Sequence, residues 1–94
     1  SLFDRNKALG SGDGGAIYNQ SSLIIQNSKF HANQALNRGG ALFNNTATAT
    51  INAKDSRFKK NTAGINGGAI YNNGGTLNLT NLSFEDNTPN DIAP

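Results

Sequence analysis

Two short motifs recur along this chain, always in the same order. The first is Phe-x-x-Asn, whose four copies begin at Phe3, Phe30, Phe58 and Phe84, at spacings of 27, 28 and 26 residues. The second is Gly-Gly-Ala followed by an aliphatic residue, an aromatic residue and Asn, and its three copies begin at Gly14, Gly39 and Gly67. Two motifs in a fixed order at a period of this length predict a repeat architecture, in which each repeat is one structural unit.

Alternating apolar and polar residues lie between each Gly-Gly block and the next Phe, as in Leu23 to Gln26 and Leu77 to Thr80. A period of two favours strands with one buried face. Each repeat then holds three strand candidates: Gly-Ala-Ile-Tyr, Leu-x-Ile and Ser-x-Phe. Strands this short cannot form a stable sheet alone, whereas stacked repeats would pair each strand with its copy. We predict an all-β fold, a right-handed parallel β-helix of about 3.5 coils with three short strands per coil.

The composition agrees with a fold that has many tight corners. The chain holds eleven Gly and sixteen Asn, and both residue types favour turns over helices. Cysteine is absent, so disulfides and thiolate metal sites are excluded, and no apolar stretch is long enough to span a membrane. Methionine is absent too, so we expect either a mature form or a piece of a longer chain. We expect one domain over 1–94, with repeats near 1–27, 28–55 and 56–81 and a partial repeat over 82–94.

Stacked coils predict columns of equivalent side chains along a common axis. The predicted core columns are Phe3, Phe30, Phe58 and Phe84; Ile17, Leu42 and Ile70; and Leu23, Ile51 and Leu77. The predicted asparagine ladders are Asn6, Asn33, Asn61 and Asn87; and Asn19, Asn44 and Asn72. A mixed third ladder would contain Asn27, Asp55 and Asn81. Amide side chains that repeat at the strand spacing can hydrogen-bond to one another.

The combined motifs, such as Gly67-Gly68-Ala69-Ile70 with Phe84 to Asn87, are similar to the repeats of chlamydial polymorphic outer membrane proteins. They also resemble repeats in other bacterial and archaeal surface proteins. The resemblance covers essentially the whole chain. It implies an extracellular or cell-surface parallel β-helix, commonly an adhesin or the passenger of an autotransporter.

The two ends of such a solenoid would expose core side chains and unpaired strand edges. We therefore expect either an excised segment flanked by neighbouring repeats of a longer chain, or subunits that stack head to tail into a filament. The expected end-to-end contact residues are Leu2, Phe3, Leu82 and Phe84. On this hypothesis the protein is not an enzyme. It would be a structural module of a fibre or of a surface adhesin, with itself, neighbouring repeats, a host ligand or a glycan as partner.

The competing hypothesis is a carbohydrate-binding or polysaccharide-cleaving β-helix. Tyr18, Phe43 and Tyr71 would form an outward aromatic stripe able to stack on sugars if the residues before them point inward. The only group that resembles a catalytic cluster consists of Asp55, Lys59, Lys60, Glu85 and Asp86. Pairing of Lys59 and Lys60 with Glu85 and Asp86 one coil later explains these charges without catalysis. We expect no catalytic residues, no metal, no cofactor and no nucleic-acid partner.

Overall fold

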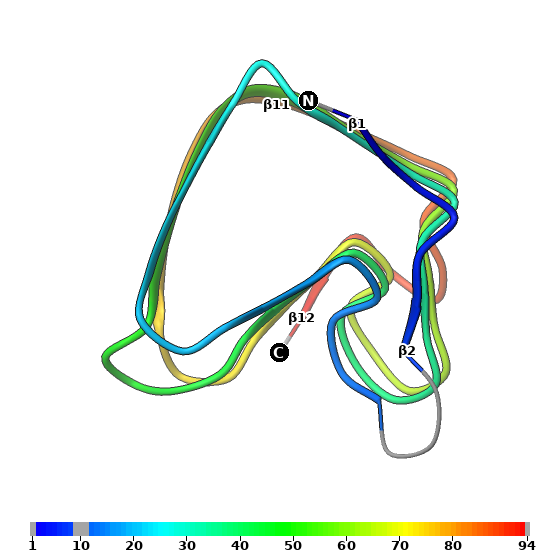
Figure 1. Cartoon of the computed structure of the whole chain (residues 1–94), viewed down its shortest axis with the longest axis horizontal. Helices are drawn as coiled ribbons and strands as arrows, with labels where there is room; N and C mark the ends of the chain where they lie inside the picture. The colour runs from blue at the N-terminus through cyan, green and yellow to red at the C-terminus, as the bar shows by residue number, and fades with distance from the viewer. Residues whose placement is uncertain (1, 9–11, 94) are drawn as a thin grey trace.

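The computed structural model describes residues 2–8 and 12–93, and in them the chain winds into a parallel β-solenoid of about three turns. Every strand pairing in the described chain is parallel, and successive coils lie directly over one another (Figure 1). No described residue is helical. The fold predicted from the sequence is therefore confirmed.

The first sheet is the largest and contains the Phe-x-x-Asn motif. Its strands are β1 (Leu2–Asp4), β4 (Ser22–Gln26), β5 (Lys29–His31), β8 (Thr50–Lys59) and β11 (Thr76–Glu85). The sheet order is β1-β5-β8-β11, and β4 pairs with the first half of β8. Phe3, Phe30, Phe58 and Phe84 occupy the same position on successive strands.

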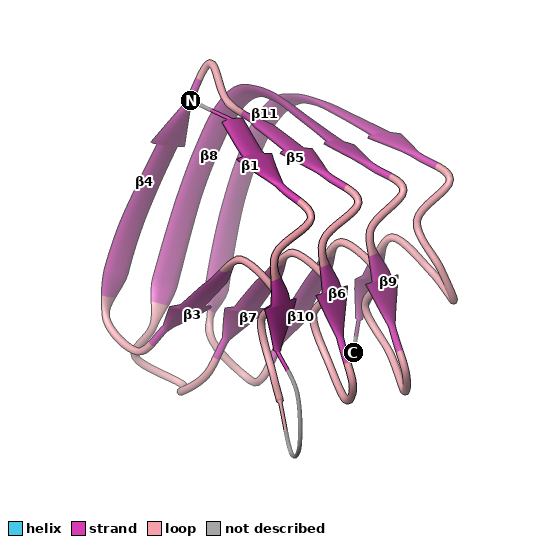
Figure 2. Cartoon of the chain, turned by 45° about the vertical axis from the view of Figure 1, so that its right-hand side comes forward, coloured by secondary structure: helices cyan, strands magenta, loops and turns pink. Residues whose placement is uncertain are grey.

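The second sheet follows the Gly-Gly blocks, in the order β12-β10-β7-β3. Its strands are β3 (Ile17–Asn19), β7 (Leu42–Asn44), β10 (Ile70–Asn72) and β12 (Ile92–Ala93). The third sheet has strands of two residues, which are β2 (Lys7–Ala8), β6 (Gln34–Ala35) and β9 (Thr62–Ala63). Figure 2 shows the three stacks side by side.

The coil differs from the expected triangle in two ways. Two of the predicted strands, Leu-x-Ile and Ser-x-Phe, merge in the later coils into the single ten-residue strands β8 and β11. The third sheet, by contrast, lies after each Phe-x-x-Asn motif, where the sequence shows only a short polar and alanine segment. The chain runs out along β6 and β9 and turns back before the second sheet, which gives these two coils a smaller lobe beside the main one (Figure 1).

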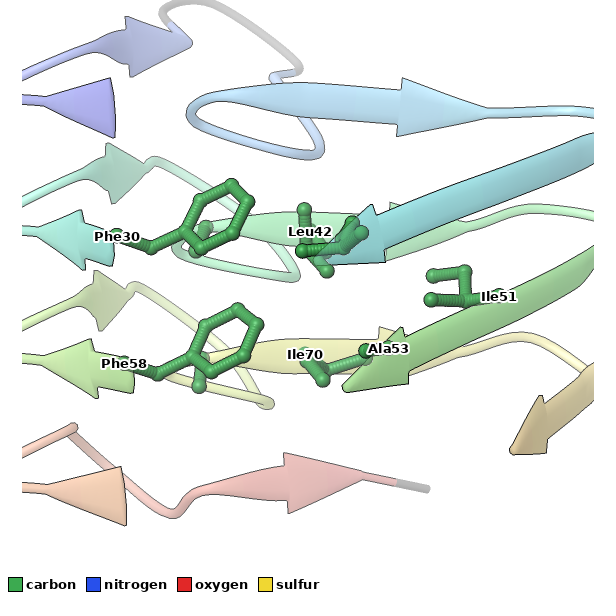
Figure 3. Close-up of a cluster of buried hydrophobic side chains, with 9 residues drawn as sticks. Phe30, Leu42, Ile51, Ala53, Phe58 and Ile70 are labelled. Carbon is green, nitrogen blue, oxygen red and sulfur yellow. The ribbon is translucent and has the colours of Figure 1, made fainter. Parts of the chain in front are cut away.

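The core of the main lobe is made of stacked columns. The rings of Phe30 and Phe58 are parallel, with centroids 4.7 Å apart, and both side chains are fully buried. Leu42 lies over Ile70 on the second sheet, and Ile51 faces both columns from the first sheet (Figure 3). Aromatic rings stacked at this distance add to the free energy gained by burying their surface. Interior packing therefore repeats from coil to coil along the axis.

The two glycines of each Gly-Gly block have different roles. Gly39 has a φ of +71°, a left-handed conformation that is unfavourable for residues with a Cβ. Gly40 has no such φ, but a Cβ built there would collide with the carbonyl oxygen of Gly68 in the next coil. The first glycine makes the turn, and the second allows successive coils to approach closely.

Candidate functional site

The first asparagine ladder joins every coil at the corner after the first sheet. Asn33 donates from both its backbone amide and its Nδ2 to Oδ1 of Asn61, each at 3.0 Å. Asn61 donates in the same way to Oδ1 of Asn87, and Asn6 to Oδ1 of Asn33. Asn33 and Asn61 are fully buried. A buried amide with all its partners present stabilises a unique register, because any slip would leave polar groups unpaired.

The second ladder runs along the end of the second sheet. Asn19 donates to Asn44 and Asn44 donates to Asn72, each with a donor–acceptor distance of 2.9 Å. Nδ2 of Asn44 also donates to the carbonyl of Ala49, so the ladder holds the following corner closed.

The mixed third ladder lies on the surface, within the bend of the first sheet. Asn27, Asp55 and Asn81 all have φ near +50°, the left-handed conformation that Asn and Asp tolerate best after Gly. Asn81 donates to Asp55 over 2.6 Å. This contact engages Asp55, one of the acidic residues of the suspected catalytic group.

The aromatic column of Tyr18, Phe43 and Tyr71 stacks with centroid distances of 5.2 and 5.4 Å. The expectation of an exposed stripe has to be corrected at its centre, because Phe43 is only 1% exposed whereas Tyr18 is 46% exposed. The guanidinium of Arg38 covers the rings of Phe43 and Tyr71, at 4.9 and 5.0 Å from their centroids. Sequence analysis missed Arg38, which comes from the returning segment of the smaller lobe.

Arg38 is held in place by Asp13 from the preceding coil. Its Nε lies 3.4 Å from Oδ1 of Asp13, and its backbone amide donates to the same oxygen over 3.2 Å. The hydrogen bond to Asp13, and after it one to Tyr71, raises the pKa of Arg38 above its already high usual value. A permanent positive charge over two aromatic rings is a stabilising cation–π arrangement.

The four expected end-contact residues do not all lie on the end faces. Phe3, Leu82 and Phe84 are half-buried and pack against the core. Leu2 pairs in register with the exposed Lys29 and is 64% exposed on the outer face of the first sheet. The alternation of the strand decides this, since Phe3 points inward and its neighbours therefore point outward.

In the last described coil, Asp91 contacts the first asparagine ladder. Nδ2 of Asn87 donates to Oδ1 of Asp91 over 3.1 Å, in the place where each earlier Asn meets the Asn of the next coil. Oδ1 of Asn90 accepts from the amide of Gly67, whereas the amide of Gly39 in the previous coil donates to the backbone carbonyl of Asn66. The side chains of Asp91 and Asn90 thus accept the hydrogen bonds that groups of the next coil accept elsewhere in the stack. The motif spacing gave no signal of this cap.

Charged side chains form two columns on the outer face of the first sheet. Lys59 pairs with Glu85, with Nζ 3.7 Å from Oε1, as the sequence alignment of coils predicted. No ion pair joins Lys60 to Asp86 in the described structure; both have positive φ at the corner, which turns them away from the strand. Sequence analysis did not single out Lys29 and Arg57, which lie in register on β5 and β8.

A shallow hollow lies over these two columns, lined by Leu2, Asp4, Lys29, Phe30, His31, Arg57 and Lys59. Nδ1 of His31 lies 2.9 Å from Oδ1 of Asp4. Within residues 2–8 and 12–93, no cluster of His, Asp and Glu could hold a metal ion. The same part of the chain contains no helix long and apolar enough to cross a bilayer.

Comparison with known families agrees with this geometry. Two segments match the Chlamydia polymorphic membrane protein repeat. They are residues 1–20 and 55–75, and each contains one Phe-x-x-Asn motif and the Gly-Gly block that follows it. The resemblance stated from the sequence is confirmed over these two segments, which are less than the whole chain for which it was stated. No curated protein and no solved structure gives a significant match to the chain.

The polymorphic membrane protein repeat is found in a family of surface proteins. Proteins of this family are surface membrane proteins, and the parallel β-solenoid of this chain agrees with the match to their repeat. The family is not known for enzymatic activity. In this chain, each matched segment includes the part of a coil from the inward Phe of the first sheet to the asparagine that ends the strand of the second sheet.

Proposed function

We propose that this chain is a non-catalytic structural module of an extracellular β-solenoid, which stacks end to end into a fibre or forms part of a cell-surface adhesin. The observation that carries the proposal is the unbroken register of Phe and Asn columns through every coil. Each coil is stabilised chiefly by its neighbours, so the natural partner of an exposed coil is another coil.

Both end faces support this proposal. On the amino-terminal face, Phe3, Ile17 and Leu23 are only partly buried, although their equivalents Phe30, Leu42 and Ile51 are fully buried. On the other face, Leu77 and Phe84 are also partly buried. A further coil would remove this apolar surface from water and pair the free edges of β1 and β11.

The two end faces present complementary hydrogen-bonding groups, an acceptor on one face and a donor on the other. Asn6 donates into the solenoid through Nδ2, which leaves its Oδ1 to accept from a coil placed before it. On the opposite face, Nδ2 of Asn87 would donate to the following coil, but it donates to Oδ1 of Asp91 instead. Head-to-tail stacking of two copies would therefore exchange the Asp91 contact for Oδ1 of the next copy's Asn6. In this arrangement Phe84 lies over Phe3, and Asp86 lies near Arg5.

Electron microscopy and sedimentation of the purified chain over a range of concentrations test the fibre form. Stacked subunits give filaments with a rise of about 19 Å per subunit, because the layers from Phe3 to Phe84 are the four strands β1, β5, β8 and β11 and the strand spacing is ~4.8 Å. Leu82→Lys places a charge on the half-buried end face, where a single molecule can direct it to water but a stacked one cannot. It should abolish filaments, while Ser83→Lys, on the exposed side of the same strand, should not.

If the chain stays monomeric at every concentration, the fibre form of the proposal is rejected and the adhesin form remains. Binding to cells or glycans tests the adhesin form. The carbohydrate-binding alternative is favoured by one observation, the basic hollow on the first sheet. Polysaccharide cleavage has no such support from the described residues.

A further inference from the structure

The outer face of the first sheet brings basic side chains from two coils into adjacent positions. Lys29 on β5 pairs in register with Arg57 on β8, and two residues further along His31 pairs with Lys59. Residues two apart on a strand point to the same face, so the four side chains form a compact group. All four line the same hollow.

The charges in this group are not equally balanced. His31 contacts Asp4 at 2.9 Å and Lys59 contacts Glu85 at 3.7 Å. Lys29 and Arg57 have no ion pair within the described chain, and they lie directly opposite each other on neighbouring strands. Like charges opposite each other in a sheet are unfavourable. An anion placed between them would remove this repulsion, so the free protein is already arranged to receive one.

The surroundings of the hollow limit what kind of anion fits. Asp4 and Glu85 stand at the two ends of the His31–Lys59 column, and the uncharged Leu2 and Ser83 stand at the two ends of the Lys29–Arg57 column, so the positive surface does not extend far enough to follow a long charged backbone. Phe30 is the only Phe, Tyr or Trp in its lining and is fully buried, and the one other ring, that of His31, is held against Asp4, so the hollow offers no aromatic platform for a row of nucleic-acid bases. Leu2 and the carboxylate of Asp4 instead offer an apolar contact and a hydroxyl acceptor beside the cations.

We infer that this hollow binds an acidic sugar of a glycan, with the carboxylate or sulfate group between Lys29 and Arg57. The guanidinium of Arg57 suits a planar or tetrahedral oxyanion through paired N–H donors, and Lys29 adds a point charge. The ring hydroxyls face Asp4 and His31, and Leu2 covers one C–H edge of the sugar. The inference gives a ligand class to the adhesive form of the proposed function, but it does not depend on end-to-end stacking.

The test is binding of the full chain to immobilised glycans: a polyuronate, heparin as the sulfated probe, and neutral dextran. We expect binding to one or both acidic polymers and none to dextran. Retention by the polyuronate assigns a carboxylate, and retention by heparin alone assigns a sulfate. The double variant Lys29→Gln/Arg57→Gln should bind about tenfold or more weakly, because two charge-assisted contacts are lost.

The matched control is Lys7→Gln/Lys54→Gln, which removes the same charge from exposed positions outside the hollow. It should bind as the parent chain does. Equal weakening by both double variants, or equally tight binding of a single-stranded DNA of the same length, would show a general charge effect and overturn the inference. Binding is measured beside sedimentation, so a chain that forms no filaments but retains the glycan separates this inference from the stacking proposal.

Discussion

The Nδ2 of Asn33 lies 3.0 Å from the Oδ1 of Asn61, one coil further along, and the backbone amide of Asn33 donates to the same oxygen. Each Asn therefore satisfies two donors of the preceding coil. In the described chain, no buried side-chain nitrogen or oxygen lacks a partner. The corner of the solenoid is a polar column as fully packed as the aromatic column beside it.

Removal of one member of this column should be costly. Asn61→Ala removes the oxygen that accepts from both donors of Asn33, and it removes the Nδ2 that donates to Oδ1 of Asn87 and to the carbonyl of Phe30. We therefore expect a loss of about 4 kcal/mol in unfolding free energy. Chemical denaturation measures it. Asn6→Ala, at the exposed start of the ladder, should cost only about 1 kcal/mol. Equal losses for the two variants would contradict the role of burial.

The second glycine of the Gly-Gly block should not tolerate a methyl group. Gly40→Ala brings a Cβ against the carbonyl of Gly68 and the backbone of Thr62, neither of which can move without separating two coils. We expect a loss of about 3 kcal/mol or more, measured by thermal or chemical unfolding. Gly74→Ala is the control: its φ is +82° but nothing lies within 4 Å, so only the conformational cost of about 1–2 kcal/mol applies.

One corner residue is poorly matched to its backbone. Ala32 has a φ of +57°, which costs a residue with a Cβ about 1 kcal/mol relative to glycine. Ala32→Gly should therefore raise the melting temperature. Ala35→Gly, in a buried strand position, should lower it. A lower melting temperature for Ala32→Gly would mean that contacts of its methyl group outweigh the strain.

Arg38 should stabilise the fold through its contacts with the aromatic column rather than through its charge alone. Arg38→Gln removes the cation from over Phe43 and Tyr71 and the pair with Asp13, and we expect a loss of about 1–2 kcal/mol. Tyrosine fluorescence and chemical denaturation report the change. Arg57→Gln removes the same charge from an unpaired exposed position and should change stability by less than about 0.5 kcal/mol.

The sequence by itself determined the repeat, the parallel stacking and the identity of the inward Phe column. A single repeat is too small to bury its own Phe, so Phe30 and Phe58 are buried by stacking equivalent residues of successive repeats over one another. Period-two alternation then separates inward from outward positions within each strand. These are local and periodic properties, so they can be recognised without coordinates.

Only the tertiary structure decided how the coil bends and what its surface presents. Three features depend on segments that meet in space but share no sequence motif. They are the outline of the smaller lobe, the packing of Arg38 over Phe43, and the contact of Asp91 with Asn87 in the place of a further asparagine. Leu2 lies beside Lys29, and Lys29 lies beside Arg57 with no acidic partner for either in the described chain. Both placements follow from the register between strands whose paired residues are 27 and 28 positions apart in the sequence. Such contacts arise from the path of the chain in space, which the repeat restricts but does not specify.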